Sequence, residues 1–148
     1  MSVPIRSATL NDLPAVMAIE RSAASAAHWS SEQYAELVAS GMVLVAEEAG
    51  EILGLVCARR IAGDWEIENV VVGARFLRRG IANELLRALL GRAESEAASA
   101  ILLDVRESNV PARRLYEKHR FREVGRRHMY YRDPPEDAIL YTLRFGLT

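Results

Sequence analysis

The sequence predicts a single α/β (α+β) domain built on a mixed, twisted sheet of about six to seven strands with helices on both faces. Its 148 residues fit one domain, 1–148, at about 150 residues per domain. Half of the residues are hydrophobic (50%), which is enough apolar material for one sizeable core. Strand-like and helix-like stretches alternate, and the strand–helix–strand order of the second half favours parallel pairing there.

The first half of the chain carries local signals for one strand, two helices and an antiparallel meander of three strands. Ser30 and Gln33 form a capping-box pattern at the start of a helix. Ala49-Gly50 is a turn signal between two strand-like runs. The expected elements are a strand at 4–8, a helix capped by Thr9 or Asn11, a helix over 30–38 ended by Gly41, and strands at 42–47, 51–60 and 65–72.

The second half predicts two helices and three strands. Apolar residues such as Ile81, Leu85 and Leu89 recur at helical spacing, which indicates a long helix over 79–96. Asn109 is expected to cap a short helix that tolerates Pro111 in its first turn. The remaining elements are a buried strand at 100–105 and two strands, at 121–131 and 138–145, on either side of a loop at 133–135.

Charge and cysteine usage exclude several classes of protein. The 19 Lys and Arg side chains against 20 Asp and Glu give a net charge of −1, which argues against a general nucleic-acid partner. The single cysteine, Cys57, excludes an internal disulfide framework, and His28, His119 and His128 match no metal-ligand spacing, so we expect no metal. Because no stretch approaches the roughly 20 apolar residues of a membrane span, and the Met1 segment lacks a secretory pattern, we expect a cytoplasmic protein and no membrane partner.

A basic turn that contains glycine follows the strand ending at Val72. It reads Leu77-Arg78-Arg79-Gly80-Ile81-Ala82-Asn83 and opens the long helix. The first turn of a helix has unpaired N–H groups, Gly80 allows close approach to the backbone, and Arg78 and Arg79 add positive charge, so the turn suits a pyrophosphate. A solvated turn is the alternative. The sequence has neither the Gly-Lys-Ser/Thr of a nucleotide P-loop nor the three-glycine dinucleotide fingerprint.

A second segment reads Leu102-Leu103-Asp104-Val105-Arg106-Glu107-Ser108-Asn109 and continues through Leu115-Tyr116 to Phe121. Together with the glycine turn it resembles the GNAT acetyltransferases, and more narrowly the RimI-like ribosomal-protein-alanine N-acetyltransferases. That family shows Asn-hydrophobic-Ala-Val before a Gln/Arg-x-x-Gly-x-Gly/Ala turn, then Leu-Glu-Val-Arg-x-Ser-Asn and Leu-Tyr-x-x-x-Gly-Phe. Further similarities extend the resemblance over nearly the whole chain. Trp29-Ser30 is similar to the family's Pro-Trp-Ser. The family's C-terminal Arg, Tyr-Tyr and Glu-Asp-Ala motifs are matched by Arg126-Arg127, Tyr130-Tyr131 and Glu136-Asp137-Ala138.

The resemblance implies a GNAT fold and an acetyl-CoA-dependent N-acetyltransferase. The implied acceptor is the N-terminal α-amine of a protein such as a ribosomal protein. A lysine or a small-molecule amine as the acceptor, and a non-catalytic CoA-binding domain, are the alternatives. The sequence does not indicate the oligomeric state.

The implied catalytic residues are Asp104, Tyr116 and Glu66. Asp104 replaces the family's glutamate general base and is one methylene shorter, so it can act through a water. The alternative is a strand-end carboxylate paired with Arg106 or Arg113. Glu66 is the rival base and shares a strand face with Glu68; solvent can also serve. Tyr116, 12 residues after Asp104, matches the family tyrosine that protonates the CoA thiolate.

The remaining site residues are also implied by the resemblance. The backbone of Val70, Val71 and Val72 pairs with the pantetheine arm and supplies an oxyanion donor. The other donor-binding residues are Arg78, Arg79, Gly80, Ile81, Ala82, Asn83 and Asn109, and the acceptor groove is lined by Trp29, Tyr130 and Tyr131. Glu136-Asp137 can attract a basic acceptor or cap a loop. The departures from the family are Leu77 for Gln or Arg, His28 for Pro, and His119-Arg120 for Leu-Gly, which leaves the end of that helix open.

Overall fold

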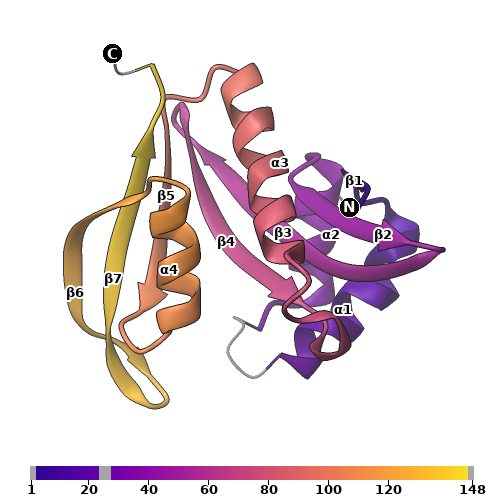
Figure 1. The fold of residues 1–148 in the computed structure, drawn as a ribbon, viewed down its shortest axis with the longest axis horizontal. Coiled ribbons are helices and arrows are strands. Elements are labelled where there is room, and N and C mark those ends of the chain that lie inside the picture. The colour runs from indigo at the N-terminus through magenta and orange to yellow at the C-terminus, as the bar shows by residue number, and fades with distance from the viewer. Residues whose placement is uncertain (1–2, 24–27, 147–148) are drawn as a thin grey trace. The chain divides into compact units, whose positions relative to one another are not determined.

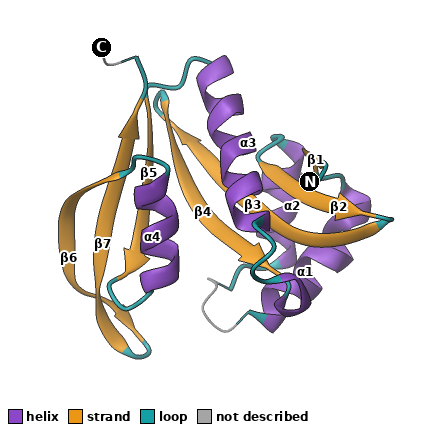
Figure 2. Cartoon of the chain, in the orientation of Figure 1, coloured by secondary structure: helices purple, strands orange, loops and turns teal. Residues whose placement is uncertain are grey.

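The computed structural model describes residues 3–23 and 28–146 and contains the predicted alternation of strands and helices (Figures 1 and 2). The strands are β1 (Ile5–Ser7), β2 (Val43–Glu48), β3 (Glu51–Ile61), β4 (Asp64–Val72), β5 (Ala100–Arg106), β6 (Arg122–Arg132) and β7 (Pro135–Arg144). The helices are α1 (Leu13–Ser22), α2 (Ser31–Ala39), α3 (Ile81–Ser95) and α4 (Val110–Lys118), with 3-10 turns at Leu10–Asp12 and Ala74–Phe76.

The strands form one mixed sheet in the order β1-β2-β3-β4-β5-β7-β6, so the predicted fold class is confirmed. The pairs β1–β2, β2–β3, β5–β7 and β6–β7 are antiparallel, and β4–β5 is parallel as the strand–helix–strand order predicts. The β4–β5 register joins Trp65 to Ile101 and Glu66 to Leu102, at the start of β4. The last residues of β4, Val70 to Val72, come after this pairing.

The chain divides into two compact units, of which the first comprises Met1–Arg59 and Ile67–Arg92. In this unit α3 lies on one face of the strands and α1 and α2 on the other (Figure 1). On the α3 face, a Cβ built at Gly54 in β3 would lie 2.8 Å from the carbonyl oxygen of Val71 and 3.3 Å from Leu85. Because real Cβ atoms do not approach this closely, glycine alone lets the two strands pack at this point. The fully buried core includes Val16, Tyr34, Val45, Leu55 and Leu86.

The second unit comprises Arg60–Glu66 and Ala93–Thr148 and contains β5, β6, β7 and α4. Figure 1 shows α4 lying along one face of these strands. Tyr116 of α4 is 7% exposed, and its ring lies 5.6 Å from that of Phe121 and 6.3 Å from that of Tyr141, between centroids. These aromatic contacts attach α4 to the sheet.

Most predicted boundaries agree with the structure to within two residues, and one differs by three. β7 begins at Pro135, whereas the sequence indicates a loop over 133–135 and a strand from 138. Arg132 pairs with Pro135, and a proline at the first position of a strand needs no ladder N–H. The turn is therefore only Asp133-Pro134, joined by a cis peptide bond.

The cap predicted for the helix over 30–38 is present, whereas α1 has Asp12 at its N-cap instead of the predicted Thr9 or Asn11. Ser30 Oγ accepts from the backbone N–H of Gln33 at 3.1 Å, and the Gln33 side chain returns to the Ser30 N–H at 2.7 Å. Thr9 precedes the 3-10 turn that leads into α1. Among residues 3–23 and 28–146, no helix is long and apolar enough to cross a membrane.

Candidate active site

The glycine turn between β4 and α3 has the backbone of an anion-binding loop. Arg78 and Gly80 both adopt positive φ, at 67° and 77°. A Cβ at Gly80 would meet nothing within 4 Å, so the glycine is required by its backbone conformation and leaves the turn open on that side. The helix begins at the next residue, Ile81, and its first-turn N–H groups lack intrahelical acceptors. These features fit the phosphates that the sequence predicts here.

Carboxylates of the first unit pair with Arg79 of this turn and with Arg75 just before it. Arg79 Nη2 donates to Glu48 at 3.1 Å (Oε1) and 2.9 Å (Oε2), and Arg75 lies 3.7 Å from Glu51. Glu48 and Glu51 flank the β2–β3 turn. A phosphate that binds Arg79 must therefore compete with Glu48, which sequence analysis did not single out.

We expect opposite effects from removing the two members of this pair. Arg79→Glu should raise the acetyl-CoA KM at least about tenfold, through loss of a charge-assisted hydrogen bond to phosphate. Glu48→Gln should lower this KM by about 2- to 5-fold, the strength of an exposed ion pair. Steady-state kinetics with varied acetyl-CoA measures both. Glu96→Gln, which breaks a similar pair with Arg60 (2.7 Å) beyond the other end of α3, is the control and should leave KM unchanged. An unaltered KM in Arg79→Glu contradicts the phosphate assignment.

Two candidate bases share one face of the sheet in the second unit. Glu66 pairs with Leu102 in the parallel β4–β5 ladder, and Asp104 follows two residues after Leu102 on the same strand. Paired residues of neighbouring strands, and residues two apart on one strand, point to the same side, so Glu66 and Asp104 do as well. Burial raises the pKa of Asp104 above its ordinary value; the positive charge of Arg127 opposes this rise, and the negative charge of Glu66 adds to it. The raised pKa moves Asp104 towards the range of a useful base.

The structure disfavours the alternative roles considered for these carboxylates. Glu68, the other candidate on β4, accepts from Arg59 Nε at 2.7 Å. The two arginines that could have neutralised Asp104 are directed elsewhere. Arg106 bonds Glu136 at 3.2 Å, and Arg113 Nε donates to the hydroxyl of Tyr141 at 3.1 Å.

The helix α4 carries Tyr116 between two well-defined ends. Asn109 caps its start, because the side-chain oxygen accepts from the Ala112 N–H at 3.3 Å, as predicted. At the other end, Arg120 adopts φ 72°, and the N–H of Phe121 donates to the carbonyl of Tyr116 at 3.0 Å. Arg120 thus takes the left-handed position that glycine usually fills, so the family's helix end is retained despite the substitution.

Tyr131 lies in the electrostatic environment of Asp104, whereas Tyr130 is more exposed. Burial is the main cause that raises the pKa of Tyr131 to about 12, and the charge of Asp104 adds to it. The guanidinium of Arg106 lies 4.3 Å from the ring centroid of Tyr131. Tyr130 packs edge-on against Tyr131 at 5.1 Å and remains 47% exposed. The structure therefore brings Glu66, Asp104 and Tyr131 together in the second unit.

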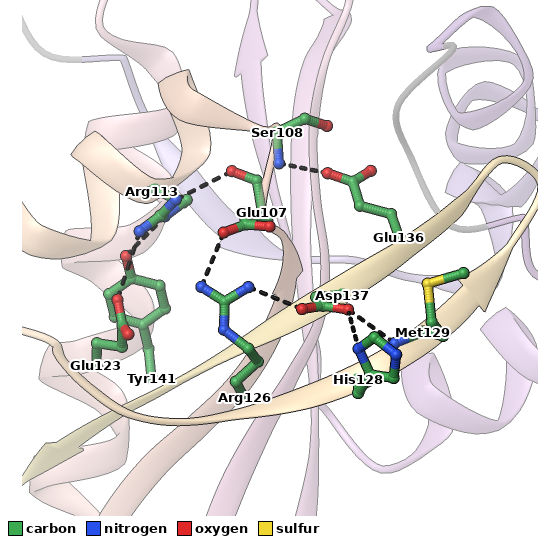
Figure 3. Close-up of polar contacts among 10 residues, drawn as sticks. All are labelled: Glu107, Ser108, Arg113, Glu123, Arg126, His128, Met129, Glu136, Asp137 and Tyr141. Atoms are coloured by element: carbon green, nitrogen blue, oxygen red, sulfur yellow. Dashed lines mark hydrogen bonds and ion pairs between the residues drawn. The ribbon is translucent and has the colours of Figure 1, made fainter.

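Glu136 and Asp137 are engaged by neighbouring groups of the same unit (Figure 3). Glu136 accepts from the Ser108 N–H at 2.5 Å, and Asp137 accepts from Arg126 and from the Met129 N–H, each at 2.8 Å. The Glu136 bond holds the β6–β7 hairpin to the loop after β5, and the Asp137 bonds join the two strands of the hairpin. Of the two interpretations left open by the sequence, the geometry favours a loop-fixing role over attraction of a basic acceptor.

Trp29 lies in the first unit, where its backbone and ring have buried partners. Its N–H donates to Glu20 Oε1 at 2.5 Å, and its ring centroid lies 6.2 Å from that of Tyr34. Glu20 could not be recognised as a functional residue from the sequence. The only signal was its placement among the apolar residues of a helix, where a carboxylate is unusual. Cys57 is fully buried, and burial raises the pKa of its thiol, so it serves as a small core residue.

The residues described by the structure contain no group of three or more His, Cys, Asp or Glu side chains that could hold a metal ion.

Comparison with known proteins places the chain in a family. Residues 12–121 match the acetyltransferase (GNAT) family. The chain is 30% identical over 146 residues to the [ribosomal protein bS18]-alanine N-acetyltransferase of Escherichia coli K12, covering 97% of this chain and 98% of the relative. It is 31% identical over 150 residues to an N-alpha-acetyltransferase of Sulfolobus acidocaldarius, covering 92% of this chain and 89% of the relative.

Solved structures agree with this assignment. The crystal structure of the ribosomal-protein-S18-alanine N-acetyltransferase from Escherichia coli superposes with a TM-score of 0.89 at 28% identity, covering 99% of this chain and 96% of that one. The GNAT resemblance inferred from the glycine turn and the Asp104–Phe121 region is confirmed, and the chain is an N-acetyltransferase. It belongs to the GNAT family of acetyltransferases.

Proposed function

We propose that this chain transfers an acetyl group from acetyl-CoA to the α-amine of a protein N-terminus, such as that of a ribosomal protein. The observation that carries this choice of acceptor is the environment of Asp104. Burial raises the pKa of this carboxyl group, which lies on the same face of the sheet as Glu66. An α-amine has a pKa of about 7.7–8.0, against about 10.4 for lysine, so a short carboxylate suffices to deprotonate it. Similarity to [ribosomal protein bS18]-alanine N-acetyltransferases supports the same acceptor, which also implies a reaction in the cytoplasm.

The donor is held mainly by backbone groups in this proposal. The main chain of Val70, Val71 and Val72 pairs with the pantetheine arm, since these residues follow the part of β4 that pairs with β5. The phosphates bind at the turn through Arg78, Arg79 and Gly80 and the first-turn N–H groups of α3. The first turn contributes Ile81, Ala82 and Asn83, and Asn109 adds a contact from the start of α4.

The reaction then needs three contributions from the protein. Asp104, directly or through a water, takes the proton of the α-ammonium, and the free amine attacks the thioester carbonyl carbon. One of the β4 N–H groups stabilises the resulting oxyanion. When the C–S bond breaks, Tyr116 donates its hydroxyl proton to the CoA thiolate. The surplus proton of the acetylated nitrogen passes through water to the tyrosinate, which yields the N-acetyl amide and free CoA. Trp29, Tyr130 and Tyr131 line the acceptor groove.

We also propose that 1–148 works as one domain, since β3, β4 and α3 each run through both compact units.

A measurement of CoA release tests the acceptor. The enzyme is given acetyl-CoA with an alanine-starting, ribosomal-type peptide, and in parallel with the same peptide whose α-amine is blocked and whose internal lysine is free. We expect CoA release only with the open N-terminus. Release with the blocked peptide moves the assignment to lysine. Absence of release with both peptides leaves a small amine as the acceptor.

A further inference from the structure

The most deeply buried carboxylate among the described residues belongs to Glu20 of α1, and the reaction does not use it. Glu20 is 1% exposed. Its Oε1 accepts from the backbone N–H of Trp29 at 2.5 Å, and His28 Nδ1 lies 3.6 Å from the same oxygen. A buried carboxylate is costly unless it is hydrogen-bonded, so these contacts account for its place in the core.

Glu20 also faces the interior between α2 and the strands. Burial is the main cause that raises the pKa of the Tyr34 hydroxyl, and the charges of Cys57 and Glu20 add to it. Glu20 is likewise a minor contributor to the raised pKa of Cys57, after burial and Glu68. Glu20 is therefore near both groups, in the buried interior of the first unit.

A continuous set of contacts leads from Glu20 towards the donor strand. Glu20 holds the backbone of Trp29, whose ring packs against Tyr34. The hydroxyl of Tyr34 accepts from Asn69 Nδ2 at 3.2 Å, and Asn69 immediately precedes Val70–Val72. The Trp29 segment is thus tied to the strand whose backbone is proposed to bind acetyl-CoA.

We propose that Glu20 is a positioning residue for the acceptor: its carboxylate fixes the backbone of Trp29 and so holds this wall of the acceptor groove in place. The proposal rests on the proposed function, in which Trp29 lines that groove. A purely structural carboxylate would affect folding and both substrates alike. A positioning residue affects the acceptor selectively.

Two substitutions separate the hydrogen bond from the packing. Glu20→Met keeps similar bulk and removes the acceptor oxygen, whereas Glu20→Gln keeps an oxygen at the same reach. We expect Glu20→Met to raise the acceptor KM about tenfold through misplacement of Trp29, with the acetyl-CoA KM within about twofold of wild type. Glu20→Gln should restore the acceptor KM. Glu36→Met makes the same chemical change at an exposed position of α2 and should change neither KM.

Hydrogen exchange at the Trp29 amide gives a readout that needs no acceptor. This amide should be protected in wild type and in Glu20→Gln, and should exchange faster in Glu20→Met. Glu20→Asp retains the charge but shortens the side chain by one methylene, so the Trp29 amide should lose part of its protection. This variant replaces Glu20→Met in the experiment if the Met variant does not fold. An unchanged acceptor KM, or equal rises in both KM values, overturns the proposal. Loss of Trp29 protection without any change in acceptor KM shows instead that Trp29 does not line the groove.

Discussion

Tyr116→Phe should lower kcat by about 10²-fold, the lower end of the contribution of a positioned general acid, while the acetyl-CoA KM stays nearly unchanged. The substitution removes one hydroxyl and keeps the ring that packs against Phe121 and Tyr141. α4 remains capped by Asn109, so the helix that carries the ring is preserved. The thiolate then has to take its proton from water, which slows departure of CoA without affecting how the donor binds.

Steady-state kinetics with a saturating acceptor peptide measures this effect. Tyr141→Phe is the matched control, because the Tyr141 hydroxyl accepts from Arg113 and donates to Glu117 at 2.6 Å within the same aromatic cluster. It should lower the Tm and leave most of kcat. Unchanged turnover in Tyr116→Phe removes Tyr116 as the acid.

Asp104→Asn should lower the rate at neutral pH by about 10²-fold and change how the rate depends on pH. Wild type takes the proton from the bound ammonium once Asp104 is ionised, so its activity should persist below the pKa of the free amine. The variant depends on amine that is already neutral in solution. Its rate should therefore keep rising with pH up to about 7.7–8.0, and the ratio of wild-type to variant rate should fall as pH rises.

Two neighbouring charges give a further check on this assignment. Glu66 raises the pKa of Asp104, so Glu66→Gln should move the acid limb of the wild-type profile to lower pH without lowering its plateau. Arg127 lowers that pKa, so Arg127→Gln should move the limb to higher pH. If Glu66→Gln instead loses the plateau and Asp104→Asn does not, Glu66 is the base. If both variants keep wild-type profiles, solvent performs the deprotonation.

The order and type of the elements could be predicted from the sequence because their signals are local. Ser30 with Gln33, and Asn109 with its helix, are each satisfied within three residues. The glycine turn is similarly short. Positions such as Arg120 and Arg78, which adopt positive φ with full side chains, carry no local signal because their conformation is imposed by the surrounding structure.

The electrostatics of the site could not be predicted, because the groups that interact are far apart in the chain. Glu48 and Arg79 are separated by 31 positions. The pKa of Asp104 depends on Glu66 and Arg127, which come from two other strands. Glu20 illustrates the same limit, since its role depends on where the backbone of Trp29 lies.

Gly54 of β3 lies directly against the main chain of Val71 and Val72 in β4. Any side chain at this position meets the carbonyl of Val71, in the stretch of β4 proposed to pair with acetyl-CoA. A substitution at Gly54 therefore displaces the main chain of Val71, which a change of the Val71 side chain itself would leave in place. In a screen for inactive variants, substitutions at position 54 should therefore be as damaging as those at the donor-binding positions, although Gly54 has no side chain and lies on the neighbouring strand.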